Sequence, residues 1–164
     1  MREPSASQPL FPTGYLVGPT TLLPWSHVEQ RLRDALNYWV CTVRPTGRPH
    51  TIPKWAVWVN RCIYFDGSPA TRHAKNIATN PSVTVHLESG DDVVIVEGYA
   101  TALTTPDPAV AAQVAAEYRR KYAAKGYAPE PAQWDAGGLF VVEPKTVLAW
   151  TVFHENPTKF EWKD

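Results

Sequence analysis

Short runs of β-branched and aromatic residues, separated by turn residues, constrain the fold of this chain more than any other feature. The sequence predicts strands at about 38–43, 51–59, 61–65, 82–88, 92–103, 139–152 and 158–162. Arg44–Pro49, which contains Gly47, is typical of a hairpin loop, and Asn60-Arg61 of a tight turn. Six to seven such strands with about three helices predict a mainly β protein, a closed or nearly closed antiparallel barrel.

Three segments have helical signals instead. Ser26–Glu29 matches a capping box and begins a helix expected over about 26–37. Thr105–Pro108 opens a second helix over about 107–124, with an apolar stripe at Val110, Val114, Tyr118 and Tyr122. A short third helix follows Ser68, a natural N-cap, and Pro69, which suits the first helical position.

The length suits one domain, preceded by an arm. Residues 1–24 are rich in Pro, Ser and Thr without sustained periodicity, so we expect an extended or partly disordered arm and a single domain over 25–164. The arm is either an irrelevant tail or a segment whose apolar residues pack over a neighbouring subunit: Leu10, Phe11, Tyr15 and Leu16.

Charge and composition exclude several classes of function. Lys plus Arg and Asp plus Glu both number 16, so no global field favours nucleic acid or an anionic membrane. The isolated Cys41 and Cys62 favour reduced core thiols, and the dispersed histidines favour no metal site. The sequence has no visible secretory signal and no apolar run of spanning length, so we expect a cytoplasmic protein.

One polar cluster could carry chemistry. The short third helix gathers a hydroxyl, three potential cations and an amide within about two turns: Thr71, Arg72, His73, Lys75 and Asn76. Such a cluster at a helix start suits a phosphate, through charge, donor groups and the helix dipole. The alternative is a solvated basic face. In a neutral chain without a rival motif, the phosphate site is the better interpretation.

The segment Gly67–Leu87 resembles the "T-R-K-x-R-N-(L/I)-x-x-(D/N)-P-x-V" motif of the pyridoxamine 5′-phosphate oxidase-like superfamily, the flavin and deazaflavin split β-barrels. Supporting matches occur in the same order along residues 26–163: Gly47–Trp55, Ile63–Phe65, Val96–Ala100 and Thr158–Trp162. The resemblance implies an FMN-binding-like split β-barrel. It further implies a homodimer with the cofactor in a groove between subunits.

The resemblance also implies roles for individual residues. Thr71, His73, Lys75 and Asn76 would face the cofactor phosphate, and Arg72 is the member most easily turned to the other side of the helix. The ring system would lie along Thr51, Ile52 and Pro53, mainly against backbone groups, with Lys54 nearby. Trp150 is a candidate ring-stacking residue, with a core or dimer contact as the alternative. His73 stands where the family often has Lys, so we expect a weaker, pH-dependent cation there.

The resemblance implies an oxidoreductase that uses coenzyme F420 or FMN for hydride transfer to a small unsaturated organic substrate, and the motif is slightly more similar to that of the F420-dependent branch. The alternatives are a non-catalytic FMN- or haem-binding split barrel, as a carrier or stress protein, and a structural dimer whose basic helix is only solvated. Substrate specificity would reside in the 125–137 loop, the N-terminal arm and the partner chain.

Overall fold

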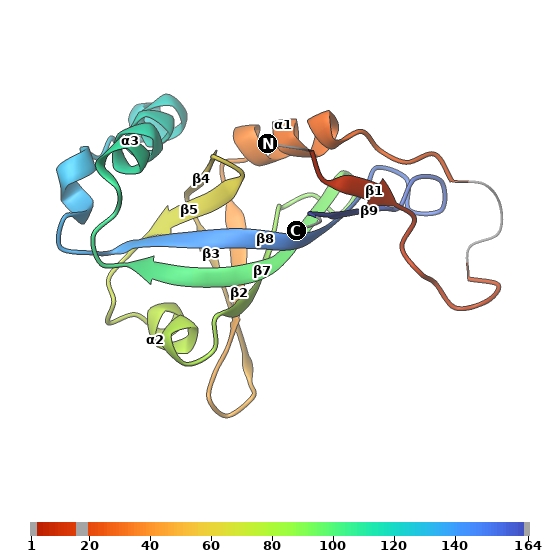
Figure 1. Cartoon of the computed structure of the whole chain (residues 1–164), viewed down its shortest axis with the longest axis horizontal. Helices are drawn as coiled ribbons and strands as arrows, with labels where there is room; N and C mark the ends of the chain where they lie inside the picture. Colours follow the sequence, from red (N-terminus) through yellow and green to blue (C-terminus); the bar gives the residue numbers. More distant parts are fainter. Residues whose placement is uncertain (1–2, 16–19, 163–164) are drawn as a thin grey trace.

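The structure, a computed structural model, describes residues 3–15 and 20–162 of the chain (Figure 1). Leu16 of the arm lies outside the described residues. The strands are β1 (Ser5–Ser7), β2 (Tyr38–Val43), β3 (Pro49–Lys54), β4 (Ala56–Val59), β5 (Cys62–Asp66), β6 (Ser82–His86), β7 (Val93–Leu103), β8 (Leu139–Trp150) and β9 (Thr158–Glu161). The helices are α1 (Trp25–Asp34), α2 (Arg72–Thr79) and α3 (Pro108–Tyr122), with the 3₁₀ turns η1 (Ala123–Lys125) and η2 (Pro131–Trp134).

The strands form one antiparallel sheet that curls into a barrel, as the sequence predicts. Its order is β1-β9-β8-β7-β6-β2-β3. Strand β8 runs along β7 with one edge, while its other edge pairs first with β5 and then with β9. Strand β3 pairs only with β2, and strand β4 pairs only with β5. Each therefore has one free edge, and the two strands are consecutive in the chain. We call the line between these two edges the seam.

The run expected as one strand over 51–59 is therefore two strands. Residues Pro49–Lys54 pair with β2, whereas Ala56–Val59 pair with β5, and Trp55 is the corner between them. Strand β3 alternates between exposed and half-buried positions, whereas all four residues of β4 are buried. The prediction of one strand missed this change of pattern at Trp55. The predicted Asn60-Arg61 turn is confirmed, with φ of 50° and 65° at the two residues.

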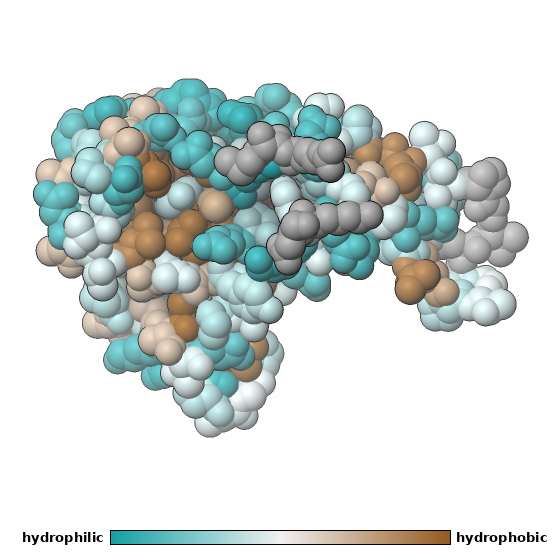
Figure 2. All heavy atoms as spheres, in the orientation of Figure 1, coloured by the Kyte–Doolittle hydropathy of each residue, from teal (hydrophilic) through white to brown (hydrophobic). Residues whose placement is uncertain are grey.

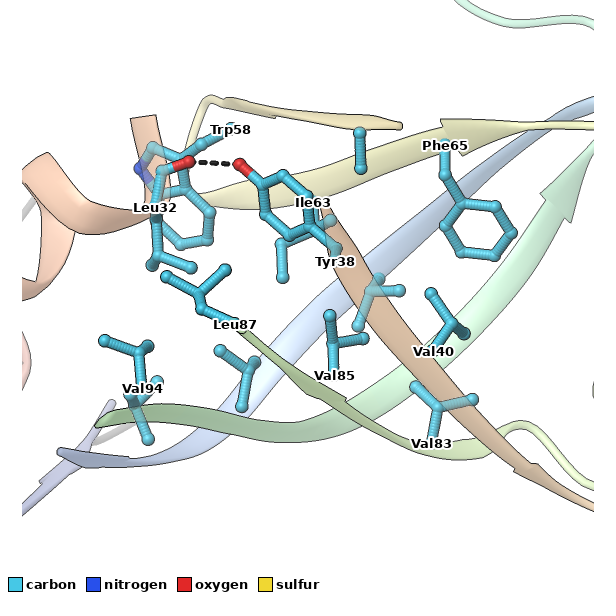
Figure 3. Close-up of a cluster of buried hydrophobic side chains, with 14 of the residues drawn as sticks. Leu32, Tyr38, Val40, Trp58, Ile63, Phe65, Val83, Val85, Leu87 and Val94 are labelled. Atoms are coloured by element: carbon cyan, nitrogen blue, oxygen red, sulfur yellow. Dashed lines mark hydrogen bonds between the residues drawn. The ribbon is translucent and has the colours of Figure 1, made fainter. Parts of the chain in front are cut away.

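The barrel interior is filled with apolar side chains (Figure 3). Helix α1 closes one end with Val28 and Leu32, both wholly buried. Tyr38 points into the same core and donates its hydroxyl to the Leu32 carbonyl. Burial raises the pKa of this phenol well above its ordinary value. A packed interior leaves no room for a ring system, so a large ligand must bind outside the barrel.

Two helix starts differ from the prediction. Helix α1 begins at Trp25 behind Pro24, so Ser26 lies inside the helix and no side chain caps it. Helix α2 begins at Arg72 behind Thr71, not at Pro69. Ser68 instead closes a turn before the helix, where its hydroxyl accepts from Ala70 N–H at 3.2 Å. Ser and Thr bond nearby backbone amides equally well in caps and in turns, so sequence alone does not separate the two.

Gly98 marks the bend that the sequence predicts within the strand at 92–103. The pairing of β7 with β8 shifts register between Glu97 and Gly98. A Cβ at Gly98 would lie 2.1 Å from the Glu143 carbonyl oxygen, which only glycine avoids. This β-bulge lets the two longest strands bend around the barrel.

Helix α3 covers β4 and β5 from outside the barrel. Its predicted stripe is confirmed at Val114, Tyr118 and Tyr122, which pack on Val57 and Tyr64 in a second apolar cluster. Asp107 caps the helix by accepting from two backbone amides. Apolar atoms are exposed between α3 and α2 in Figure 2, which indicates that α3 covers only part of the barrel.

Part of the N-terminal arm adds a strand to the sheet. Strand β1 pairs with β9, and the arm then extends away from the barrel (Figure 1). Phe11 and Tyr15 contact Phe153 there, with ring centroids 5.6 and 6.2 Å away. Leu10 is fully exposed.

Candidate cofactor site at the barrel corner

The corner at Trp55 is held in place by the end of α3. Tyr118 donates to the Trp55 carbonyl at 3.0 Å, and Tyr122 accepts from the Ala56 amide at 3.0 Å. Lys121 donates to the Ala56 carbonyl at 2.7 Å, and burial lowers the pKa of its ammonium to about 7. These bonds fix the backbone at the seam, and so fix the position of the preceding residue, Lys54.

Lys54 crosses the seam to the end of β5. Its Nζ donates to the Asp66 carbonyl at 2.8 Å and lies 5.7 Å from the centre of the Phe65 ring. Burial lowers its pKa, against a smaller raising effect of Asp66. No salt bridge joins Lys54 to a carboxylate within the described part of the chain. A half-buried cation that forms no salt bridge favours an anionic ligand.

Gly67 makes room beside this ammonium. A Cβ at this position would lie 2.9 Å from Lys54 Nζ and 3.5 Å from His73 Nε2. The Nε2 atom of His73 is in turn 3.2 Å from the Thr71 hydroxyl. We call this group of Lys54, Gly67, Thr71 and His73 the Lys54 notch.

His73 is buried rather than a solvent-facing cation. It is 3% exposed and lies near the rings of Phe65 and Phe140, at centroid distances of 5.9 and 5.8 Å. Burial, with smaller effects of Lys54 and His50, lowers its pKa to about 4. The expected pH-dependent cation near neutral pH is therefore wrong for the free protein: His73 offers a hydrogen bond there, and no charge.

Asn76 shares this inner face of α2. It is wholly buried and donates its amide to the Thr42 hydroxyl at 2.9 Å. Its Oδ1 atom has no hydrogen-bond partner among the residues that the structure describes. Asn76 thus ties α2 to β2, one turn beyond the notch.

Arg72 and Lys75 occupy the opposite face of the same helix. Both are exposed, whereas His73 and Asn76 are buried. The 3.6-residue period of a helix places i and i+3 on one side, which separates these two pairs. The five residues that the sequence groups as one phosphate site are therefore divided, and Lys54 rather than Lys75 is the cation beside His73.

The predicted ring-binding strand, β3, is an edge. The Arg44 amide donates to the Arg48 carbonyl at 2.9 Å. From that pair onward, hydrogen-bonded and non-hydrogen-bonded residue pairs alternate along β2 and β3. The non-hydrogen-bonded positions of β3 therefore direct their backbone groups away from β2 and toward the seam. They are Pro49, Thr51 and Pro53. Prolines are tolerated at such an edge because they have no N–H to pair. The Thr51 amide is the backbone donor between two prolines, and the Ile52 side chain packs on the core.

Trp150 lies far from the notch within one chain. It is at the last position of β8, paired with Val93, and its ring contacts Phe153 at 5.2 Å. Phe140, beside His73, is ten residues earlier on the same strand, roughly 33 Å away at 3.3 Å per residue. Trp150 is therefore not part of this site within one chain.

Three hollows surround the notch and the sheet. One of about 350 Å³ lies at the corner between Pro53, Lys54 and Tyr127. Another of about 460 Å³ extends from Asp66 along Gly67–Pro69 to Gln133, Trp134 and Ala136–Gly138. A third, of about 430 Å³, opens over β2, β6, β7 and β8 beside Cys41 and Tyr99.

Three residues of this region carry no role in the sequence prediction: Asp66, Gly67 and Tyr127. Gly67 heads the motif segment, so its position was a usable signal. Asp66 ends a strand and Tyr127 lies in a Pro-rich loop, and neither pattern indicates that they meet. Only the pairing of β5 with β8 and the docking of α3 bring them together.

The donors of the notch fit a phosphate group. A lysine ammonium, a hydroxyl and an imidazole converge where a glycine leaves space, and no described carboxylate forms a salt bridge with the ammonium. The Thr71 hydroxyl donates to the Ser68 carbonyl at 2.8 Å in the free protein, so it would have to turn to donate to a phosphate. Metal binding has no comparable support: no group of three potential ligands lies together in residues 3–15 and 20–162. The described helices include none that is long and apolar enough to cross a membrane.

The chain resembles known proteins in sequence and in fold. A family model described as pyridoxamine 5′-phosphate oxidase matches residues 25–151. No curated protein matches the sequence. A solved F420 reductase is 25% identical, with a TM-score of 0.56 over 73% of this chain and 94% of that one.

Two further solved structures share the fold. General stress protein 26 from Bacillus anthracis is 19% identical, with a TM-score of 0.58 over 74% of this chain and 89% of its own. The haem storage protein HutZ from Vibrio cholerae is 18% identical, with a TM-score of 0.58 over 76% of this chain and 92% of its own. At these identities the likeness concerns the fold and not the ligand.

Proposed function

The chain belongs to the pyridoxamine 5′-phosphate oxidase family, and from this premise we propose that it is an oxidoreductase working with FMN or coenzyme F420. Its substrate would be a small unsaturated organic molecule. The observation that carries the proposal is Lys54, a half-buried cation without a carboxylate partner in the described chain, beside a space kept open by Gly67. The resemblance to an F420 reductase supports the deazaflavin as one of the two candidates.

In this proposal the Lys54 notch holds the cofactor phosphate. Lys54 supplies the charge, while Thr71 and neutral His73 supply hydrogen bonds. The seam edge of β3 supports the ring through the Thr51 amide and the carbonyls of Pro49 and Pro53. When bound, the cofactor supplies hydride transfer, and the protein's part is to orient the ring and exclude water.

We also propose that the protein is a homodimer. The outer faces of β2, β6 and β7 carry Trp39, Ile95 and Tyr99, the last 49% exposed, and α3 packs on β4 and β5 instead. A second copy over this face would enclose a ring lying outside the filled barrel. It would also bring an aromatic residue such as Trp150 toward the notch.

The test is a titration of the purified protein with FMN, coenzyme F420 and haem, followed by absorbance and calorimetry. We expect FMN or F420 to bind, and Lys54→Met to weaken that binding about 10- to 100-fold through the loss of one charge-assisted bond. Lys75→Met, a matched change on the outer face of α2, should alter affinity less than about twofold.

Two results would contradict the proposal. Tight binding of haem with neither flavin-type cofactor would favour a haem-handling split barrel, the fold that HutZ shares. Equal losses of cofactor affinity in Lys54→Met and Lys75→Met would mean that the phosphate binds outside the notch.

A further inference from the structure

The Asp66 carboxylate makes its hydrogen bonds on the side of the loop after α3, although it is close enough to Lys54 to raise the pKa of that ammonium. Lys54 binds the backbone carbonyl of Asp66, whereas the side chain turns to the loop after α3. There its Oδ2 atom accepts from the Tyr127 hydroxyl, from Gln133 Nε2 at 3.2 Å and from Trp134 Nε1 at 3.4 Å. The two ends of one residue thus border two neighbouring spaces.

The space on the carboxylate side is the hollow of about 460 Å³, which we call the Asp66 cavity. Its other lining residues are uncharged at neutral pH, since burial and the bond to Asp66 raise the pKa of Tyr127 to about 12. All the hydrogen bonds that the described residues make to this carboxylate go to Oδ2. Oδ1 is left for a ligand.

The walls of this cavity are held by backbone contacts. The Gly67 amide donates to the Gly138 carbonyl at 2.9 Å, which joins the turn after β5 to the loop before β8. Gly137 and Gly138 have φ of 91° and 93°, a conformation that other residues rarely adopt. Gln133 also donates to the Tyr127 hydroxyl at 2.8 Å, so the donors around Asp66 hold one another in place.

We propose that the Asp66 cavity is a binding site for a small molecule with a cationic nitrogen, an ammonium or amidinium group that pairs with the Asp66 carboxylate. The half-buried ring of Tyr127 suits the apolar part of such a molecule. Calling this molecule the substrate rests on the proposed function, because the corner hollow beside Lys54 and the Asp66 cavity share Asp66 and Tyr127. The charge selectivity of the cavity does not depend on the cofactor.

The test uses three probes of one shape and different charge: benzamidine, benzamide and benzoate, each titrated into the full chain by calorimetry. We expect benzamidine to bind at least about tenfold more tightly than benzamide, and benzoate more weakly still. Asp66→Asn should reduce benzamidine affinity about tenfold, to that of benzamide. Because the asparagine oxygen can still accept from Tyr127, this variant separates a ligand-binding charge from a loop anchor. Ser68→Ala, in the same cavity, should change affinity less than about twofold.

Three outcomes would overturn the proposal: benzoate binding as tightly as benzamidine, no benzamidine binding up to about 10 mM, or unchanged benzamidine affinity in a folded Asp66→Asn protein. Titration of the same proteins with FMN and F420 keeps the two proposals distinct. If the wild-type protein binds neither cofactor but still prefers benzamidine, only the proposal of an oxidoreductase is rejected. If the protein binds a cofactor but does not prefer benzamidine over benzamide and benzoate, only the proposal of a site for a cationic ligand is rejected.

Discussion

The two faces of α2 carry similar residues in opposite environments. His73 and Asn76 are 3% and 0% exposed and bond to neighbouring polar side chains, whereas Arg72 and Lys75 face solvent. The permanent charges of the helix are therefore on the side away from the notch. The charge beside His73 comes from β3 instead, through Lys54. A polar cluster in a sequence is one site only when helical geometry keeps its members together.

The largest effect should come from placing a charge on the inner face. Asn76→Asp puts a carboxylate into a wholly buried position without a cation, and should lower the free energy of unfolding by about 3–5 kcal/mol. Lys75→Asp on the outer face should change it by less than about 1 kcal/mol. Urea denaturation at pH 7 measures both. Similar losses in the two variants would abolish the distinction between the faces.

A second comparison uses pH. Because the pKa of His73 falls from 6.5 to about 4 on folding, its stabilising contribution is present above pH 6.5 and is lost as pH falls toward 4. The wild type should lose at most about 3 kcal/mol across this window relative to His73→Phe, which cannot be protonated. Parallel stability profiles of the two proteins would show that His73 is not buried in its neutral form.

A third change narrows the notch itself. Gly67→Ala adds a methyl group 2.9 Å from Lys54 Nζ, so the flexible ammonium must move and cofactor affinity should fall about 3- to 10-fold. Gly90→Ala is the control, since a Cβ there meets nothing within 4 Å. Titration with FMN or F420 gives both affinities. An unaffected Gly67→Ala would mean that the ligand does not enter beside Lys54.

The smallest effect should come from the outer face. Replacing Arg72 and Lys75 together by Gln removes two exposed charges, and should weaken cofactor binding less than about threefold at low salt. At high salt the difference should vanish, because screening already removes a long-range attraction. A larger loss that persists in high salt would mean that these residues contact the phosphate directly.

Much of the architecture could be predicted because it depends on local patterns. Alternating β-branched runs, the Asn60-Arg61 turn and the stripe of α3 each express a period or a turn preference within a few residues. The helix starts were less predictable, since Ser26 and Ser68 satisfy cap patterns that the backbone uses differently. The corner at Trp55 was not predicted, because which strand β4 pairs with depends on the distant β5 and not on the residues beside Trp55.

The sequence by itself determined the barrel, the three helices and the motif that marks the family, because these depend on residue order and periodicity. Only the tertiary structure decided which polar residues meet. Burial made His73 neutral, helical geometry turned Lys75 outward, and the seam placed Lys54 beside Gly67. Charge, exposure and proximity at a site depend on residues far apart in the chain, and no local pattern encodes them.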